Sequence, residues 1–252
     1  MHSGYILYMG KILSIVIPVF NKFNFTRACL NDLSRLPNDH EIIIVDNAST
    51  DNTKDQLQNS KEIVYIRNNI NEGFAKASNK GFYNSSAPNI LFLNNDIRVK
   101  SNYDNWTKPI IEKCNDGLVG PTMGQLDKEL NFVQEANKIL TGNSYMSGWC
   151  LGSSRNNWAK LIIPRWYENP DILVMETDVD RDHYSQVFSE EFGIAYFEDT
   201  DLSFRARKLG IKMQVVDIPV VHFGKQTSSQ LNTYQLYKNA RSIFVKKWKN
   251  KL

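Results

Sequence analysis

Short clusters of polar residues follow three apolar segments in the first hundred residues, at the point where each segment ends. The segments and their clusters are 11–20 (KILSIVIPVF) with Asn21, 41–45 (EIIIV) with 46–49 (DNAS), and 89–93 (NILFL) with 94–96 (NND). Apolar runs of this kind are typical of strands buried on both faces of a parallel sheet. Because ligands bind outside the carboxyl ends of such strands, the clusters predict one shared polar site, suited to a nucleotide and a metal.

Two aspartates in these clusters have side chains suited to binding a ligand. The carboxylate of Asp46 can accept hydrogen bonds from a nucleobase or a ribose, while the alternative is a turn in which Thr50 or Asp51 caps a helix. Asp96 can bind a hard divalent cation, which prefers oxygen ligands, with Asn94 as a neutral or water-mediated partner. The alternative for this last cluster is a polar turn.

A third acidic cluster, 198–201 (EDTD), opens a helical pattern late in the chain. Acidic residues in a first turn are favoured by the helix dipole, so charge–dipole capping is one interpretation. The cluster exceeds what capping needs, however, and one of its carboxylates is placed to act as a general base. A lone histidine, His222, ends a later apolar segment. Such a histidine is more often structural than a ligand, but together with Asp96 it becomes a metal partner.

Alternating strands and helices position these residues in the first half of the chain. Helices are predicted over 25–36, from 49–51 to Asn59, and over 71–84 after Gly73, with a further strand over 63–67. Strand–helix–strand units give parallel strand pairs joined by right-handed crossovers. The predicted fold class is therefore α/β, a single domain whose mostly parallel central sheet is flanked by helices.

The second half of the chain has a less regular pattern. Strands are predicted over 118–121, 145–151 and 212–221, and helices over 198–209 and 234–249, while 127–141 is ambiguous. The stretch 153–188 has scattered aromatic and charged residues without a clear period. A stretch of this length without regular structure is usually a functional lid or a mobile segment, and we expect a lid there.

Composition and charge exclude several classes of protein. A net charge of +3 over 252 residues, with no nucleic-acid-binding motif, argues against a nucleic-acid partner. The three cysteines, Cys29, Cys114 and Cys150, never form a C-x-x-C pair, which excludes a disulfide framework and suits a reducing compartment. No apolar run is long enough to span a bilayer and no signal peptide is recognised, so a cytoplasmic location is expected.

Motifs that are absent narrow the function further. Neither the G-x-G-x-x-G dinucleotide fingerprint nor the G-x-x-x-x-G-K-[ST] phosphate loop follows the first strand, which disfavours a Rossmann dehydrogenase and a P-loop ATPase. The glycine-rich G-x-G-T-R loop of a sugar-nucleotide pyrophosphorylase is replaced by PVFN (18–21). The cluster at 198–201 also superficially matches the D-x-D-x-T nucleophile of aspartyl phosphatases. That motif belongs at the end of a first strand, so this interpretation is rejected.

Seven sequence blocks, in order, resemble the family 2 glycosyltransferases of GT-A fold, particularly the rhamnosyltransferase-like bacterial branch. The blocks are 14–21 (SIVIPVFN), 42–51 (IIIVDNASTD), 68–81 (NNINEGFAKASNKG), 90–96 (ILFLNND), 148–155 (GWCLGSSR), 196–210 (YFEDTDLSFRARKLG) and 220–224 (VVHFG). The resemblance implies a single Rossmann-like domain. It also implies inverting transfer of a hexose or deoxyhexose from a UDP-, dTDP- or GDP-linked donor to a glycan or lipid-linked acceptor, in surface polysaccharide synthesis.

The resemblance also assigns roles to individual residues. Asp199 aligns with the catalytic base, and Asp96 with His222 aligns with the ligands of a divalent cation, Mn²⁺ or Mg²⁺. Residues implied to bind the donor nucleotide are Pro18, Phe20, Asn21, Asp46, Asn47, Ser49, Asn71, Gly73, Asn79, Asn94 and Asn95. Gly148, Trp149 and Glu198 are implied to line the acceptor or sugar side.

The resemblance also implies a division of the chain and leaves one alternative open. The domain is expected over 11–230, with a nucleotide-binding half at 11–97 and an acceptor-binding half at 98–230, the lid included. The remainder, 231–252, is expected to be a basic helix, either a surface helix packed on the domain or a peripheral contact with the inner face of an anionic membrane. Asn94 replaces the first aspartate of the family's D-x-D motif. This departure supports the alternative of a non-catalytic sugar-nucleotide or glycan-binding protein on the same fold.

Overall fold

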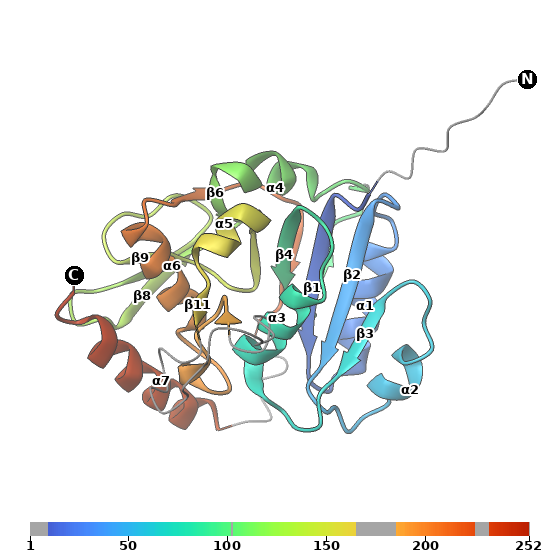
Figure 1. Ribbon diagram of the computed structural model, residues 1–252, viewed down its shortest axis with the longest axis horizontal. Coiled ribbons are helices and arrows are strands. Elements are labelled where there is room, and N and C mark those ends of the chain that lie inside the picture. Colours follow the sequence, from blue (N-terminus) through green and yellow to red (C-terminus); the bar gives the residue numbers. More distant parts are fainter. Residues whose placement is uncertain (1–9, 102, 165–184, 225–231, 252) are drawn as a thin grey trace, which may run out of the picture.

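The computed structural model describes residues 10–101, 103–164, 185–224 and 232–251. Within these ranges seven strands form a central sheet in the order β13-β6-β10-β4-β1-β2-β3 (Figure 1). Their bounds are β1 Leu13–Val19, β2 His40–Asp46, β3 Val64–Arg67, β4 Asn89–Leu93, β6 Gly117–Gly120, β10 Cys150–Ser154 and β13 Lys212–Val215. Only β10 runs antiparallel to its neighbours, so the predicted mostly parallel sheet is confirmed.

The order of the first strands brings the predicted polar clusters together. β1 lies between β2 and β4 and is parallel to both, with Val19 paired to Asp46 and Val16 to Phe92. The chain therefore moves from β1 towards β3 on one side and returns to β4 on the other. This reversal of strand order beside β1 is the place where open α/β sheets bind ligands.

Helices cover both faces of the central sheet. Their bounds are α1 Phe23–Leu33, α2 Thr53–Leu57, α3 Gly73–Tyr83, α4 Lys108–Lys113, α5 Arg155–Lys160, α6 Glu198–Lys208 and α7 Thr233–Trp248. One buried apolar cluster joins the sheet to α1 and α4, and a second joins the opposite face to α3, α5 and α6. β1 supplies Ile15 and Ile17 to the first cluster and Val16 to the second, because successive side chains of a strand point to opposite faces.

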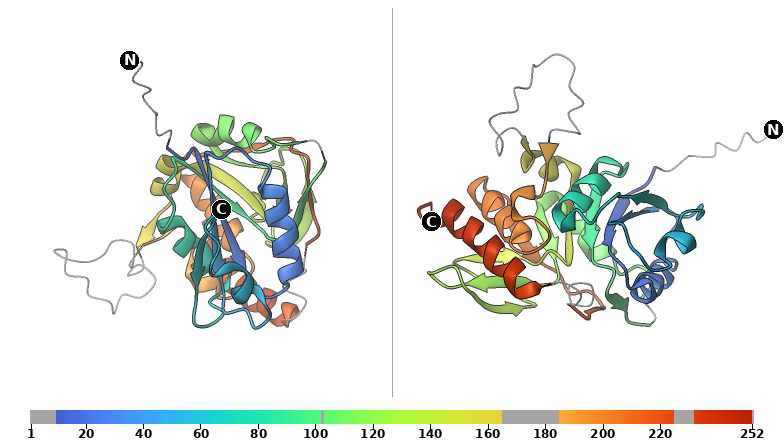
Figure 2. Two further views of the ribbon diagram at one scale, coloured as in Figure 1. Left: turned by 90° about the vertical axis from the view of Figure 1, so that its right-hand side faces the viewer. Right: turned by 90° about the horizontal axis from the view of Figure 1, so that it is seen from below.

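A third apolar cluster docks the C-terminal helix α7 on α6, and the two helices run side by side in Figure 2. Phe244 is fully buried and its ring contacts Phe204 of α6 at 5.2 Å between centroids. Asp201, also fully buried, accepts a hydrogen bond from the Trp248 indole at 2.8 Å and pairs with Lys247 at 3.0 Å. Aromatic packing and this ion pair therefore make α7 part of the domain. One of its basic residues, Lys247, is neutralised by the buried Asp201.

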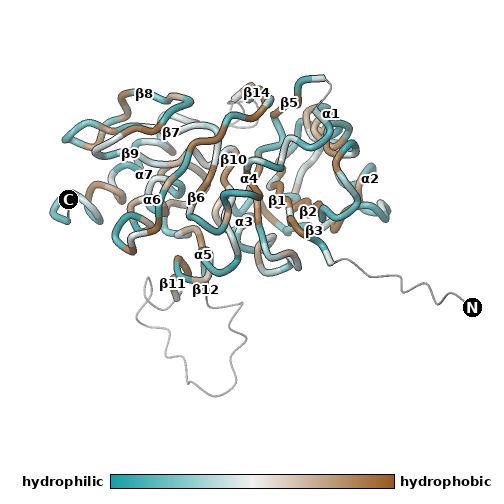
Figure 3. Tube along the Cα trace, turned by 90° about the horizontal axis from the view of Figure 1, so that it is seen from above, coloured by the Kyte–Doolittle hydropathy of each residue, from teal (hydrophilic) through white to brown (hydrophobic). Residues whose placement is uncertain are grey.

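Small sheets complete the fold outside the central sheet. Their strands are β5 Ile97–Val99 with β14 Val220–His222, β11 Ile163–Pro164 with β12 Ser185–Gln186, and the order β8-β7-β9, formed by β7 Met123–Leu126, β8 Phe132–Ala136 and β9 Ser144–Met146. β8 lies at the rim of the molecule and carries a brown, hydrophobic stretch in Figure 3. Short 3₁₀ turns lie at Cys114–Asp116 and Glu190–Phe192. No helix within the described ranges is both long and apolar enough to cross a membrane.

Two predicted strands are each divided in the structure. The segment 145–151 is split between β9 and β10, because the backbone N–H of Gly148 leaves the ladder and binds Asp199 at 2.8 Å. The segment 212–221 is split between β13 and β14 around Pro219, which has no N–H to donate to a ladder. The ambiguous stretch 127–141 contains strand β8.

The stretch 153–188, expected to lack regular structure, contains helix and strand at its described beginning and end. Residues 155–160 form helix α5, whose Trp158 is fully buried against Phe92 of β4. Val187 and Phe188 are fully buried as well. No clear period is visible in the sequence here because α5 is short and its one large apolar residue, Trp158, packs in the core. The central part of the predicted lid, 165–184, lies outside the described residues.

Candidate functional site

A cavity of about 980 Å³ opens at the carboxyl ends of β1 and β4. Its floor is formed by the ends of these strands and by the start of α3, and its other walls come from the β7–β8 hairpin, the loop before α6, and α7. The predicted site residues that line it are Pro18, Phe20, Asn47, Asn71, Gly73, Asn94, Asn95, Asp96, Gly148, Trp149, Glu198 and Asp199. The fold therefore brings Asp96, Asp199 and most of the predicted donor residues to one place.

Asp46 lies under this cavity, fully buried at the end of β2. Its Oδ1 accepts a hydrogen bond from the backbone N–H of Ser49 at 2.8 Å, and its Oδ2 accepts from the Tyr65 hydroxyl and the Arg67 guanidinium. Burial and the hydrogen bond to Asp46 raise the pKa of Tyr65 to about 12, so this hydroxyl keeps its proton and donates it. The hydrogen bonds of the Asp46 carboxylate are therefore made with protein groups, and this residue does not line the cavity.

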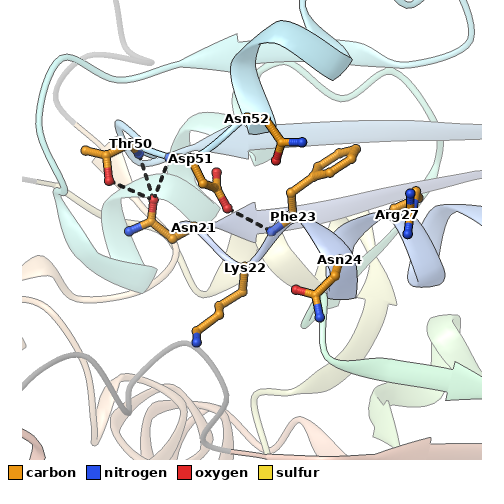
Figure 4. Close-up of a pocket in the computed structure, with 8 residues that line it drawn as sticks. All are labelled: Asn21, Lys22, Phe23, Asn24, Arg27, Thr50, Asp51 and Asn52. Atoms are coloured by element: carbon orange, nitrogen blue, oxygen red, sulfur yellow. Dashed lines mark hydrogen bonds between the residues drawn. The ribbon is translucent and has the colours of Figure 1, made fainter.

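Asn21 lies beside a second, smaller hollow of about 510 Å³ (Figure 4). Its side-chain oxygen accepts hydrogen bonds from the backbone N–H groups of Thr50 at 2.7 Å and Asp51 at 3.3 Å, and its own N–H donates to the Ser49 hydroxyl at 2.7 Å. Asp51 in turn accepts from the N–H of Phe23 at the start of α1 at 2.9 Å. Asn21 and Ser49 therefore tie the loop after β1 to the loop after β2.

Asn79 faces away from the cavity and joins α3 to the segment that leads into α6. It is 1% exposed, and its side-chain oxygen accepts from the N–H groups of Val187 at 3.0 Å and Phe188 at 2.9 Å. Its amide nitrogen donates to the carbonyl of Phe188 and to Glu190, both at 2.9 Å. All its hydrogen-bonding capacity is directed at this segment, whereas the sequence predicted a contact with the donor.

The start of α3 and the loop before α6, which form two walls of the cavity, meet at Gly73. This residue has a φ of +85°, and a Cβ built on it would lie 2.6 Å from the carbonyl oxygen of Gly193 and from the Cα of Ile194. The next residue, Phe74, donates its N–H to the carbonyl of Ile194 at 3.0 Å. Only glycine fits this close approach, which holds the start of α3 against the loop that precedes α6.

Asp96 and His222 form the predicted metal position. Nε2 of His222 lies 3.1 Å from Oδ1 of Asp96 and 3.4 Å from the side-chain amide of Asn94. Asp96 is 4% exposed, and within the described residues its buried Oδ1 has the contact with His222 but no hydrogen bond. A buried carboxylate oxygen without a hydrogen bond costs free energy that a cation would offset. A carboxylate, an imidazole and an amide suit a divalent cation whose other ligands are phosphate oxygens, so these residues fit such a metal.

This metal position is incomplete by itself. Among the described residues, no group of three or more His, Cys, Asp or Glu side chains is placed to hold a metal ion. The Trp149 ring stacks on the His222 ring, with centroids 4.7 Å apart and planes 12° apart, which fixes the orientation of the imidazole. Protein groups alone therefore offer few ligands, and a bound diphosphate would have to complete the shell.

Asp199 and Glu198 begin α6 at the opposite wall of the cavity. Asp199 accepts hydrogen bonds from the N–H of Gly148 at 2.8 Å and from the N–H and hydroxyl of Thr200 at 2.7 and 3.1 Å. Two consecutive residues before the pair, Tyr196 and Phe197, have φ values of +80° and +69°. Strained backbone of this kind persists only where its surroundings hold it, and here it aims the acidic pair at the cavity.

Burial shifts the protonation of both acidic side chains. The pKa of Asp199 is raised by desolvation and, to a lesser degree, by the charge of Glu135. The pKa of Glu198 is raised by desolvation and by the negative charge of Asp199. Oε2 of Glu198 is buried without a hydrogen-bond partner among the described residues. The pair therefore retains a proton to higher pH than ordinary carboxylates do, and Asp199 is the member whose hydrogen bonds favour the ionised form.

Several cavity residues were not singled out from the sequence. They are Glu135 from β8, Tyr145 from β9, Ile194 and Tyr196 from the loop before α6, and Tyr234 with Tyr237 from α7. Glu135 lies in the stretch whose secondary structure was ambiguous, and its side chain accepts hydrogen bonds from residues 12 and 13 positions away in the chain. No local motif marks such residues, because only the tertiary fold brings them to the cavity.

Comparison with known proteins identifies related sequences. The sequence model of the family described as Glycosyl transferase family 2 matches residues 14–151. The chain is 29% identical over 114 residues to glycosyltransferase GlyA of Streptococcus pneumoniae, a match that covers 43% of this chain and 16% of GlyA. It is 30% identical over 109 residues to the putative teichuronic acid biosynthesis glycosyltransferase TuaG of Bacillus subtilis, covering 40% of each protein. The match thus spans less than half the length of either relative.

Comparison with solved structures identifies the fold. Staphylococcus aureus TarS in complex with UDP-GlcNAc superposes with a TM-score of 0.54 at 15% identity, covering 93% of this chain and 66% of TarS. GalNAc-T7 with UDP, GalNAc and Mn²⁺ superposes with a TM-score of 0.61 at 15% identity, covering 85% of this chain and 44% of that protein. The expected GT-A fold is confirmed by these superpositions and by the central sheet.

Proposed function

The chain belongs to glycosyl transferase family 2, and on this premise we propose that it transfers a sugar from a nucleotide-diphosphate sugar to a hydroxyl group of a glycan or a lipid-linked acceptor, with inversion at the anomeric carbon. The observation that carries the proposal is the position of Asp199. Its carboxylate faces the cavity that Asp96 also lines, on the wall opposite the nucleotide-binding strand ends. A protein that only binds sugar nucleotides needs no such base.

In the proposed reaction Asp199 accepts the proton of the acceptor hydroxyl. The hydroxyl oxygen forms a bond to the anomeric carbon while the bond from that carbon to the diphosphate oxygen breaks, and the electron pair leaves with the diphosphate. General base catalysis of this kind contributes roughly 10²–10⁴-fold to a rate. The N–H of Gly148 and the hydroxyl of Thr200 hold the carboxylate in place and favour its ionised form.

The leaving diphosphate carries negative charge that must be neutralised. The described residues that line the cavity include no lysine, arginine or histidine. Asp96, His222 and Asn94 would hold a divalent cation, Mn²⁺ or Mg²⁺, which when bound supplies Lewis-acid stabilisation of the diphosphate. The Mn²⁺ in the GalNAc-T7 structure supports this assignment as a precedent within the fold.

We further propose that the donor is a UDP-, dTDP- or GDP-linked hexose or deoxyhexose, as in the rhamnosyltransferase-like branch, and that the product belongs to a surface polysaccharide. The likeness to TuaG, a putative teichuronic acid biosynthesis glycosyltransferase, supports a role in surface polymers. Within the domain, we assign donor binding to 11–97 and acceptor binding to 98–230. The opening of the cavity between these two halves supports that division.

The proposed function is tested by nucleotide binding and by one substitution. Thermal shift against UDP, GDP, dTDP and CMP, each with and without Mn²⁺, should show stabilisation by one nucleoside diphosphate that depends on the metal. Asp199→Asn should then abolish transfer from the matching donor while leaving this stabilisation nearly intact. No shift with any nucleotide would favour the alternative, a glycan-binding protein. Loss of nucleotide binding in Asp199→Asn would mean that this residue is structural.

The basic C-terminal helix is the proposed contact with an anionic membrane surface. Lys238, Lys246 and Lys249 are exposed, whereas Lys247 is paired with Asp201 inside the fold. Removing α7 would also remove the Phe244 ring from the apolar core, so a truncation would test folding as much as binding. Vesicle flotation of a Lys238→Gln, Lys246→Gln, Lys249→Gln variant against the unchanged chain is the better test, and equal flotation would contradict the contact.

A further inference from the structure

The cavity has an unusual balance of charge for a site that faces a sugar acceptor. Four carboxylates line it: Asp96, Glu135, Glu198 and Asp199. The described lining residues include no cationic side chain that would offset them. Asp96 is accounted for by the metal position and Asp199 by the proposed proton transfer. Glu135 has no part in either of these, and it stands on the acceptor-side wall.

Glu135 is held in one orientation by neutral donors. Its Oε1 accepts hydrogen bonds from the hydroxyls of Thr122 at 2.8 Å and Ser147 at 2.6 Å, and from the Trp149 indole N–H at 3.3 Å. The same indole N–H also donates to Thr122 at 2.9 Å. Oε2 receives no hydrogen bond from a described residue, and the side chain is exposed at the mouth of the cavity. The result is a fixed carboxylate with a free acceptor oxygen.

Aromatic residues line the same cavity as this carboxylate. They are Phe132, Tyr145, Trp149, Tyr196, Tyr234 and Tyr237. Faces of aromatic rings offer apolar contact to the C–H faces of a sugar ring and attract cations, whereas they offer nothing to an anion. The indole of Trp149 is fixed on both sides, by Glu135 through its N–H and by His222 through ring stacking.

We propose that Glu135 and Trp149 form an acceptor subsite for a sugar ring that is uncharged or carries an amino group. The proposal rests on the proposed function and names its acceptor class. The ring lies against the indole face, and Oε2 of Glu135 accepts a hydrogen bond from a ring hydroxyl or an ammonium group. A ring that carries a carboxylate or a phosphate is disfavoured, because its charge meets the carboxylates of Glu135 and Asp199 and no cationic side chain stands among the described lining residues.

Three methyl glycosides of nearly equal size test the subsite. The probes are methyl β-D-glucoside, the corresponding 2-amino glycoside and the corresponding glucuronide, with the galactose series as a second scaffold. Dissociation constants are measured at pH 6.5 by saturation-transfer NMR on the full chain, with Mn²⁺ and the nucleotide selected by thermal shift. We expect the amino glycoside to bind best and the uronate to bind about tenfold more weakly than the neutral glycoside in at least one series.

Glu135→Gln is the discriminating variant. Glutamine keeps the oxygen that accepts from Thr122, Ser147 and Trp149, and it replaces only the free oxygen by an NH₂ group. The dissociation constant of the amino glycoside should rise about tenfold, since hydrogen bonds between charged partners are the stronger ones, and the penalty on the uronate should shrink. Glu129→Gln removes an equal charge from an exposed site in the same hairpin and should change none of these values.

Each failure has a separate meaning. Uronate binding equal to or tighter than glucoside binding, or the same values in Glu135→Gln as in the unchanged chain, would overturn the subsite. Nucleotide binding without any glycoside binding would also overturn it while leaving the proposed function intact. Selective glycoside binding without nucleotide binding would support the subsite and contradict the transferase.

Discussion

Replacing Glu198 by glutamine should stabilise the folded protein at neutral pH. Glu198 is an acid whose folded-state pKa lies above its unfolded value, raised from 4.5 to about 8 by desolvation and by the charge of Asp199. For such a group, the stability of the unchanged protein is fully present below pH 4.5 and is lost as the pH rises through the folded pKa. The glutamine variant has no proton to lose. Its free energy of unfolding should therefore increasingly exceed that of the unchanged protein as the pH rises between these two pKa values.

The size of the effect follows from the same shift. One pKa unit corresponds to about 1.4 kcal/mol of differential free energy between the two protonation states. The outer part of the Glu198 side chain reaches the cavity, and its titration is coupled to that of Asp199. We therefore expect Glu198→Gln to raise the free energy of unfolding by about 2 to 4 kcal/mol, which is less than the whole pKa shift implies. At low pH the protonated Glu198 and its glutamine replacement are both neutral. The difference in the free energy of unfolding measured there therefore gives the cost of burying the amide, which is subtracted from the differences at higher pH.

Denaturant unfolding at pH 4.5, 6 and 8 measures this prediction. The free energy of unfolding is obtained for the unchanged chain, for Glu198→Gln and for Glu129→Gln as a surface control. The difference between Glu198→Gln and the unchanged chain should increase steadily with pH, whereas the control should show no such trend. An advantage that is equal at all three pH values, or that falls as pH rises, would refute the interpretation of Glu198 as a buried acid.

Three further substitutions test other parts of the structure. Asp96→Asn should remove the metal-dependent part of the thermal shift given by the preferred nucleotide, and an unchanged shift would argue against a metal ligand. Phe244→Ala should lower the free energy of unfolding by about 3–5 kcal/mol, measured in urea, because this fully buried ring joins α6 to α7. Gly148→Ala should slow transfer about 10- to 100-fold in a steady-state assay, since its Cβ would lie 3.0 Å from the Cβ of Asp199. Nucleotide stabilisation equal to that of the unchanged chain would show that this last effect is local to the base.

The α/β class, the strands and helices of the first half, and the convergence of the polar clusters could be predicted from the sequence. This information is local: an apolar run such as 41–45 must be buried, and the polar cluster 46–49 must then lie at the end of its strand. Parallel pairing follows because a helix stands between successive strands. The order of the family blocks added the identity of the fold and the candidate base.

The partners of the buried polar groups were decided by the tertiary structure alone. Asp46 was expected to contact the ligand, but β3 places Tyr65 and Arg67 beside its carboxylate. Asn79 was expected to contact the donor, but the fold brings the backbone of 187–188 to its amide. A side chain with several hydrogen-bonding atoms has many possible partners. Its neighbours in the sequence do not indicate which distant segment of the chain will pack against it in the fold.

The acceptor side of the cavity also depended on long-range contacts. Glu135 comes from an edge strand with no clear pattern, and Tyr237 comes from a helix more than a hundred residues further along the chain, yet both line one cavity. The sequence by itself determined that the chain forms a parallel sheet with a polar site at the strand ends, because burial and strand period are properties of short segments. The walls that face this site were decided only when the apolar clusters of α6 and α7 packed together, since packing joins segments that share no local signal.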